Sequence, residues 1–213
     1  MRLRSVNVGS PREMSVGSSK VLSGIHKAPV KGRVQMGRSN LSGDGQADLE
    51  NHGGVDKAVY VYAQDHYAYW ESELGRCDLE PGAFGENFTA EGMTDDVVGL
   101  GDIYRVGTGV VQVTQPRVPC AKLGALFGDP RFPKRFLASR RPGFYLAVLE
   151  EGVVEAGDVV ELLEKDPQGL PVAEALGIRF FDPGNEAALR RILSISALSQ
   201  AWRTDIESLL ARL

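Results

Sequence analysis

The stretch GDIYRVGTGVVQVT, residues 101–114, contains two strand-like runs and a turn-like sequence between them, and it is the clearest structural pattern in the chain. Residues 103–106 and 110–114 are rich in β-branched and aromatic side chains, which favour extended backbone. Between them, Gly107-Thr108-Gly109 can adopt the positive φ angles of a tight turn. The pattern predicts a β-hairpin. Further strand-like runs occupy 59–62, 144–149 and 159–163, and many short strands with glycine turns are typical of a barrel or folded sheet.

Helical patterns are few in the first 165 residues. One follows Asp65, a candidate N-cap, and another begins at Cys120 and ends before the Gly-Asp-Pro sequence at 128–130. We therefore expect two helices inserted into the sheet. Their apolar faces are formed by Tyr67, Trp70 and Leu74 in the first helix and by Leu123, Leu126 and Phe127 in the second.

The character of the sequence changes at DPQGLP, residues 166–171, which has the composition of a linker. Three short helical patterns follow, and Ser199 is the expected cap of the last. So small a helical unit is marginal alone and should dock on the preceding domain. We expect a mainly β fold with some α: a β-barrel-like domain over residues 1–165 and a three-helix domain over residues 172–213.

The composition argues against several classes of function. The 213 residues are 43% hydrophobic and carry a formal net charge of -4, which does not favour nucleic-acid or membrane-surface binding. No run approaches the roughly 18 apolar residues of a membrane span, and no secretory signal is expected. Two cysteines and three histidines, without CxxC, HxxxH or HExxH spacing, are too few for a closed zinc site. A reducing cytoplasm with free thiols is the expected location.

Cys120 lies in QPRVPCAK, residues 115–122, at the start of the second predicted helix. A thiol ionises more readily beside cations and a helix N-terminus, and here Arg117 and Lys122 flank it. The resulting thiolate can serve as a metal ligand or a nucleophile. A buried, inert cysteine is the alternative, and spacing alone leaves both open. Cys77, which follows a predicted helix, is expected to be incidental.

A polar, glycine-rich segment, SGDGQADLENHGGVDK at residues 42–57, precedes a predicted strand. Its glycine turns can direct backbone N–H groups at a phosphate, which Lys57 can neutralise. Taken alone, an ordinary polar loop is the favoured interpretation.

Basic residues concentrate between positions 117 and 141, where seven accompany one acid, Asp129. A solvated helix face is the usual meaning of such a run. The functional interpretation is a basic rim that holds an anionic cofactor and receives an acidic partner. The seven are Arg117, Lys122, Arg131, Lys134, Arg135, Arg140 and Arg141.

Several strings of this chain, in order and over nearly its whole length, resemble the YiiM-like subgroup of the MOSC-domain family. They are GQADL (45–49), HGG (52–54), DKAVY (56–60), PGAFGEN (81–87), GD (101–102), QPRVPC (115–120), GFY (143–145) and LSQAWR (198–203). The resemblance implies a β-barrel-like MOSC domain that binds the molybdopterin form of the molybdenum cofactor, followed by a small three-helix domain. It also implies detoxifying reduction of N-hydroxylated compounds such as 6-hydroxylaminopurine and related base analogues.

The resemblance assigns the metal-ligand role to Cys120, and soft sulfur donors suit molybdenum. Lys57 and Arg117 are expected at the cofactor phosphate. Catalytic roles are expected for Cys120, His52 and Asp48. Asp44 is a further candidate for carrying protons, and no feature of the sequence chooses among His52, Asp48 and Asp44 for this role. The full set of expected cofactor contacts is Gly53, Gly54, Lys57, Asn87, Arg117, Cys120 and Lys122.

The chain has no flavin, haem or iron–sulfur signature, so its electrons are expected from an external flavodoxin- or ferredoxin-like donor protein. A small N-hydroxylated molecule is the expected substrate. Two other functions stay open. One is a molybdenum-cofactor carrier or sulfuration protein acting through a Cys120 persulfide, and the other is a metal-free thiol hydrolase using Cys120 and His52.

Overall fold

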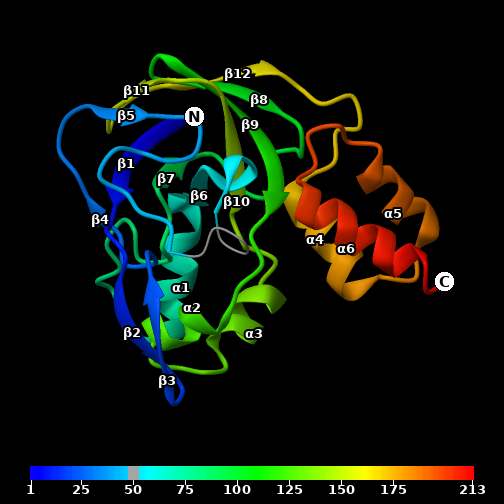
Figure 1. The fold of residues 1–213 in the computed structure, drawn as a ribbon, viewed down its shortest axis with the longest axis horizontal. Coiled ribbons are helices and arrows are strands. Elements are labelled where there is room, and N and C mark those ends of the chain that lie inside the picture. The colour runs from blue at the N-terminus through cyan, green and yellow to red at the C-terminus, as the bar shows by residue number, and fades with distance from the viewer. Residues whose placement is uncertain (48–52) are drawn as a thin grey trace.

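The computed structural model describes residues 1–47 and 53–213, in which a mostly β domain is followed by helices (Figure 1). The main sheet contains β1 (Arg2–Val8), β4 (Ala28–Pro29), β6 (Val59–Ala63), β7 (Phe88–Glu91), β8 (Ile103–Val106), β9 (Gly109–Pro116), β10 (Phe144–Glu150) and β12 (Val160–Glu164). Their order across the sheet is β12-β8-β9-β10-β6-β7-β1-β4. The strands pair antiparallel except β6 and β7, which run parallel. Two small antiparallel ribbons join β2 (Arg12–Val16) to β3 (Ser19–Ser23) and β5 (Val34–Met36) to β11 (Gly152–Val154).

The sheet curls until strands from its two ends meet. The Leu3 amide donates to the Asp158 carbonyl at 2.8 Å, and the Val160 amide donates to the Met1 carbonyl at 3.1 Å. β1 therefore contacts the start of β12, although the two stand seventh and first in the sheet order. The sheet is therefore strongly curved, in keeping with the predicted barrel or folded sheet. The hairpin of β8 and β9 is confirmed, with φ of +57° at Gly107 in its turn.

Three helices pack an aromatic cluster beneath the sheet: α1 (Tyr67–Leu74), α2 (Ala121–Leu126) and α3 (Phe132–Ala138). Two 3-10 turns, η1 (Val55–Lys57) and η2 (Gln64–His66), flank β6. α1 and α2 are predicted from the sequence, whereas α3 is not. The expected cap at Asp65 is wrong, because this residue lies in η2 and its carboxylate accepts from the Gly92 amide at 2.9 Å.

The C-terminal helices α4 (Val172–Phe181), α5 (Glu186–Leu193) and α6 (Gln200–Leu210) lie together on one side of the sheet domain (Figure 1). Their docking on that domain is confirmed by hydrogen bonds from the Val172 amide to the Val98 carbonyl and from the Ser199 amide to the Thr114 carbonyl. Ser199 caps α6 as predicted, since its side chain accepts from the Trp202 amide. None of the helices in the described residues is long and apolar enough to cross a membrane.

Candidate functional site

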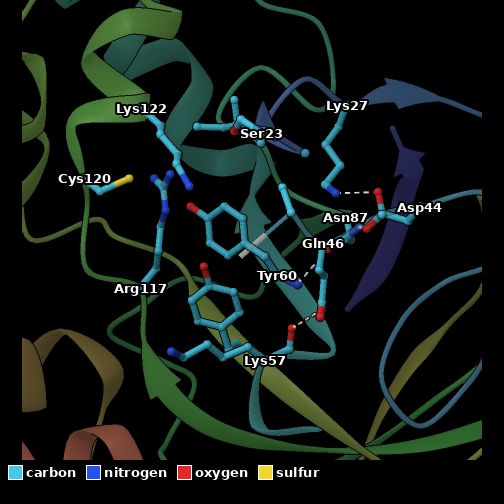
Figure 2. Close-up of a pocket in the computed structure, with 16 residues that line it drawn as sticks. Ser23, Lys27, Asp44, Gln46, Lys57, Tyr60, Asn87, Arg117, Cys120 and Lys122 are labelled. Carbon is cyan, nitrogen blue, oxygen red and sulfur yellow. Dashed lines mark hydrogen bonds and ion pairs between the residues drawn. The ribbon is translucent and has the colours of Figure 1, made fainter. Parts of the chain in front are cut away.

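Cys120 stands at the junction of β9 and α2, on the wall of a cavity of about 80 Å³. It is the extended residue that precedes the first turn of α2, with φ of -124°. The described lining residues include four basic side chains and one acidic one: Lys27, Lys57, Arg117, Lys122 and Asp44. Figure 2 shows Cys120, Arg117 and Lys122 on one side of the cavity and Lys27 and Asp44 on the other. Such a balance of charge favours an anionic ligand.

Arg117 is the most unusual residue of the cavity, because a guanidinium is buried here at 5% exposure. Its backbone amide donates to the Gly143 carbonyl at 3.0 Å, which holds the end of β9 against β10. Its charge lies over two rings, with Cζ 4.9 Å from the centroid of Tyr60 and 5.4 Å from that of Phe136. Within the described residues, its Nη1 has no hydrogen-bond partner. Burying an unpaired donor and charge is costly, so this geometry favours a bound anion.

The pKa of Arg117 is raised. Burial acts to lower this pKa, but the negative forms of Tyr60, Tyr145 and Cys120 outweigh that effect. The two tyrosines face each other across the β6–β10 pair, with ring centroids 5.3 Å apart. Burial raises the pKa of both phenols, although Arg117 opposes the shift. They therefore stay protonated at neutral pH, and Tyr60 donates its hydroxyl proton to the Pro142 carbonyl at 2.8 Å.

The opposite wall is a buried polar network around Asp44. Its carboxylate forms an ion pair with Lys27, accepts from the Gly9 amide at 2.9 Å and accepts from the Asn87 side chain at 2.9 Å. Burial lowers the pKa of Lys27, and attraction to Asp44 partly offsets this shift. Asn87 also accepts from the Tyr60 amide at 3.1 Å. The network fixes the position of β6 relative to the cavity, and it engages most of the polar atoms of Asp44 and Asn87.

The cavity brings together most of the predicted cofactor contacts. Lys57, Asn87, Arg117, Cys120 and Lys122 all line it. Gly53 and Gly54 are not among its described lining residues, and the Gly54 amide donates to the Gln46 side chain at 3.2 Å. The predicted catalytic residues Asp48 and His52 lie outside the described residues.

The side chains that sequence reasoning missed come from distant parts of the chain. Lys27 follows β3, while Tyr60 and Tyr145 lie on β6 and β10. No local motif marks them, because only the pairing of the strands brings them to Cys120. Among residues 1–47 and 53–213, no group of three or more histidine, cysteine, aspartate or glutamate side chains is placed to hold a metal ion.

Comparison with known proteins defines the class. The family model of the MOSC domain matches residues 48–161, so the chain belongs to the MOSC-domain family. The model described as the YiiM-like, 3-alpha helix domain matches residues 170–213. Within the family, the chain is therefore of the YiiM-like kind, with the three-helix domain that its sequence predicts.

Two similar proteins span nearly the whole chain, and a third spans about three quarters of it. The uncharacterized protein YflK of Bacillus subtilis is 45% identical over 94% of this chain and 90% of its own length. The crystal structure of YiiM from Geobacillus stearothermophilus is 38% identical, covers 98% of both chains and superposes with a TM-score of 0.84. A protein of Gibberella moniliformis named Reductase is 37% identical over 76% of this chain, which spans 29% of that longer protein.

Proposed function

We propose that this protein is an oxidoreductase that uses the molybdopterin form of the molybdenum cofactor, held at Cys120, to reduce N-hydroxylated compounds such as 6-hydroxylaminopurine. The observation that carries the proposal is the buried Arg117 guanidinium beside Cys120. Its Nη1 is without a hydrogen-bond partner in the described part of the chain, and the surrounding cavity is basic. Membership of the MOSC-domain family and a relative named Reductase support the choice of cofactor and reaction type.

The charges and donor groups of the cavity suit such a cofactor. The cofactor has a phosphate group, whose negative charge suits the basic lining. The planar guanidinium of Arg117 can donate two hydrogen bonds to a phosphate, and the ammonium group of Lys57 can neutralise its charge. The Cys120 thiolate is a soft ligand that suits molybdenum, and Arg117 favours the ionised form of the thiol. When bound, the cofactor supplies the two-electron reducing centre.

The overall reaction converts R–NH–OH, two electrons and two protons into R–NH2 and water. Tyr60 and Tyr145 serve as neutral walls of the site, because burial raises the pKa of each phenol. Asp44 is already engaged by Lys27, Gly9 and Asn87. This leaves Asp48 and His52 as the favoured proton carriers among the three candidates.

The test is a pair of cysteine variants, purified from a host that makes the cofactor. Cys120→Ser should abolish reduction of 6-hydroxylaminopurine by a chemical reductant and lower the molybdenum content, while circular dichroism shows an intact fold. Cys77→Ser is the matched control because Cys77 is exposed and away from the cavity, and it should keep full activity. A folded Cys120→Ser protein with normal turnover and normal metal content would exclude the proposal. Transfer of cofactor to an acceptor enzyme without any turnover would instead indicate a carrier.

A further inference from the structure

A second cavity adjoins Cys120 from the other side. Its volume is about 510 Å³, and it lies between the MOSC domain and the three-helix domain. Cys120, Lys57 and Tyr145 line both cavities. A molecule in the second cavity can therefore contact a group that is bound to Cys120 in the first cavity. The volume exceeds what a molecule as small as hydroxylamine requires and suits a ligand of ring size or larger.

The wall on the side of the three-helix domain is built around Arg179 of α4. Its guanidinium carbon lies 4.5 Å from the ring centroid of Phe180 and 4.8 Å from that of Trp202. The guanidinium also forms an ion pair with Asp205 of α6, and the Arg179 side chain is 16% exposed. The rings and the carboxylate together hold the guanidinium in one orientation at the edge of the cavity.

Two donors in this wall are unpaired. Nη1 of Arg179 and Nε1 of Trp202 are buried and have no hydrogen-bond partner among the residues that the structure describes. A buried donor without an acceptor costs free energy comparable to a lost hydrogen bond. Both residues line the cavity, so a ligand whose acceptors reach these two atoms recovers this cost.

We propose that the second cavity is the substrate-binding site, and that Arg179, Trp202 and Asp205 recognise the ring of the substrate; this inference rests on the proposed function. Arg179 and Trp202 offer N–H donors, while the Asp205 carboxylate is an acceptor, 49% exposed. The Arg179–Asp205 pair has no net charge, so it suits an uncharged ring with a donor and an acceptor side by side. The N–OH group then points towards Cys120, and the three-helix domain sets specificity.

Binding is measured without turnover by using 6-aminopurine, the product expected from 6-hydroxylaminopurine. The chain has two tryptophans, so a Trp70→Phe background leaves Trp202 as the fluorescent reporter. In this background 6-aminopurine should quench the fluorescence in a saturable way. Arg179→Met should raise the dissociation constant about tenfold or more, the effect of losing one hydrogen bond to a charged group. Arg190→Met is the matched control, because Arg190 is an exposed residue of α5 paired with Glu186, and it should bind normally.

Kinetics provide the second measurement. Arg179→Met should raise the KM for 6-hydroxylaminopurine about tenfold, and it should raise the KM for hydroxylamine, which has no ring for Arg179 to hold, much less. Absence of saturable quenching, or normal binding by Arg179→Met, would overturn the substrate site. Loss of molybdenum from Arg179→Met would overturn it as well, because the cavity would then belong to the cofactor. Normal 6-aminopurine binding in a protein that reduces no N-hydroxylated compound would refute the proposed function and leave the binding site standing.

Discussion

The buried Arg117 side chain is expected to lower the stability of the folded protein and to raise its affinity for an anion. Its guanidinium is buried, and Nη1 has no partner in the described residues. The rings of Tyr60 and Phe136 compensate part of the burial cost through cation–π contacts. The remainder weakens the folded protein until an anion binds. This uncompensated cost is the reason we expect Arg117 to serve ligand binding more than the stability of the fold.

These two opposing effects give a prediction for Arg117→Met. In protein prepared without cofactor, the variant should have an equal or higher Tm, because methionine fills the site without a buried charge. Under limiting cofactor, its affinity for cofactor should fall about tenfold or more, since a hydrogen bond to a charged group is lost. Arg131→Met is the control, because that side chain is 90% exposed and should change neither quantity. A lower Tm with undiminished molybdenum content would mean that Arg117 is purely structural.

The residues of the cavity that lie in a recognisable sequence motif could be predicted from the sequence. Arg117 and Lys122 follow from local spacing, and Lys57 from the glycine-rich segment, and all three line the cavity as expected. Asp44 lies in the same glycine-rich segment and is a predicted candidate, but Lys27 and its pairing with Asp44 could not be found in this way. They are 17 positions apart and meet only because the folded chain returns to the same wall. A buried ion pair of this kind depends on tertiary structure and leaves no local pattern.

At the scale of elements, helices are predicted better than strands: among the described residues α3 is the one α-helix that the sequence does not predict, whereas β1–β5, β7 and β11 are all unpredicted. The β8–β9 hairpin follows directly from a glycine turn between two β-branched runs. α3 was missed because its sequence, FPKRFLA, is short and basic and contains a proline near the start. Its buried residues Phe132 and Phe136 are one helical turn apart, and this was the available signal.

α6 allows a prediction about how an element positions a cavity. The Ser199 hydroxyl accepts from the Trp202 amide at 3.2 Å and donates to the Gln115 side chain at 2.6 Å, so it joins α6 to β9. Ser199→Ala removes the cap and leaves a buried acceptor unpaired. Urea denaturation should show a loss of about 1–3 kcal/mol in the free energy of unfolding. Ser208→Ala, on the exposed face of the same helix, should change it by less than about 0.5 kcal/mol. Equal effects of the two substitutions would show that the cap does not hold the domain interface.

In the whole molecule, Cys120 lines the cavity between the two domains, and the basic run from 117 to 141 starts close to it in the sequence. The basic residues of this run lie in different environments. Arg117 is buried, and Arg135 is paired with Glu73 at 3.3 Å and with Asp129 at 3.5 Å. Arg131, Lys134 and Arg140 remain exposed. These three are the part of the run that a partner protein can meet.

An external electron donor is a requirement of the proposed reaction, which consumes two electrons per turnover. We expect an acidic, flavodoxin- or ferredoxin-like protein to dock on the exposed basic residues, because opposite charges speed encounter. Donor-supported turnover should then fall as salt rises, since the Debye length shrinks from about 10 Å at 0.1 M to about 3 Å at 1 M. Turnover driven by a small chemical reductant should respond much less.

Charge reversal locates the docking surface. Arg131→Glu combined with Lys134→Glu should raise the donor concentration needed for half-maximal rate and leave the chemical-reductant rate unchanged. The matched control is Lys20→Glu with Lys31→Glu, which reverses two exposed lysines in the N-terminal part of the chain. This control changes the net charge equally, so it separates a local docking surface from the overall electrostatic field of the protein. If both double variants weaken the donor equally, or if both assays respond alike to salt, the basic run is a solvated surface and the donor docks elsewhere.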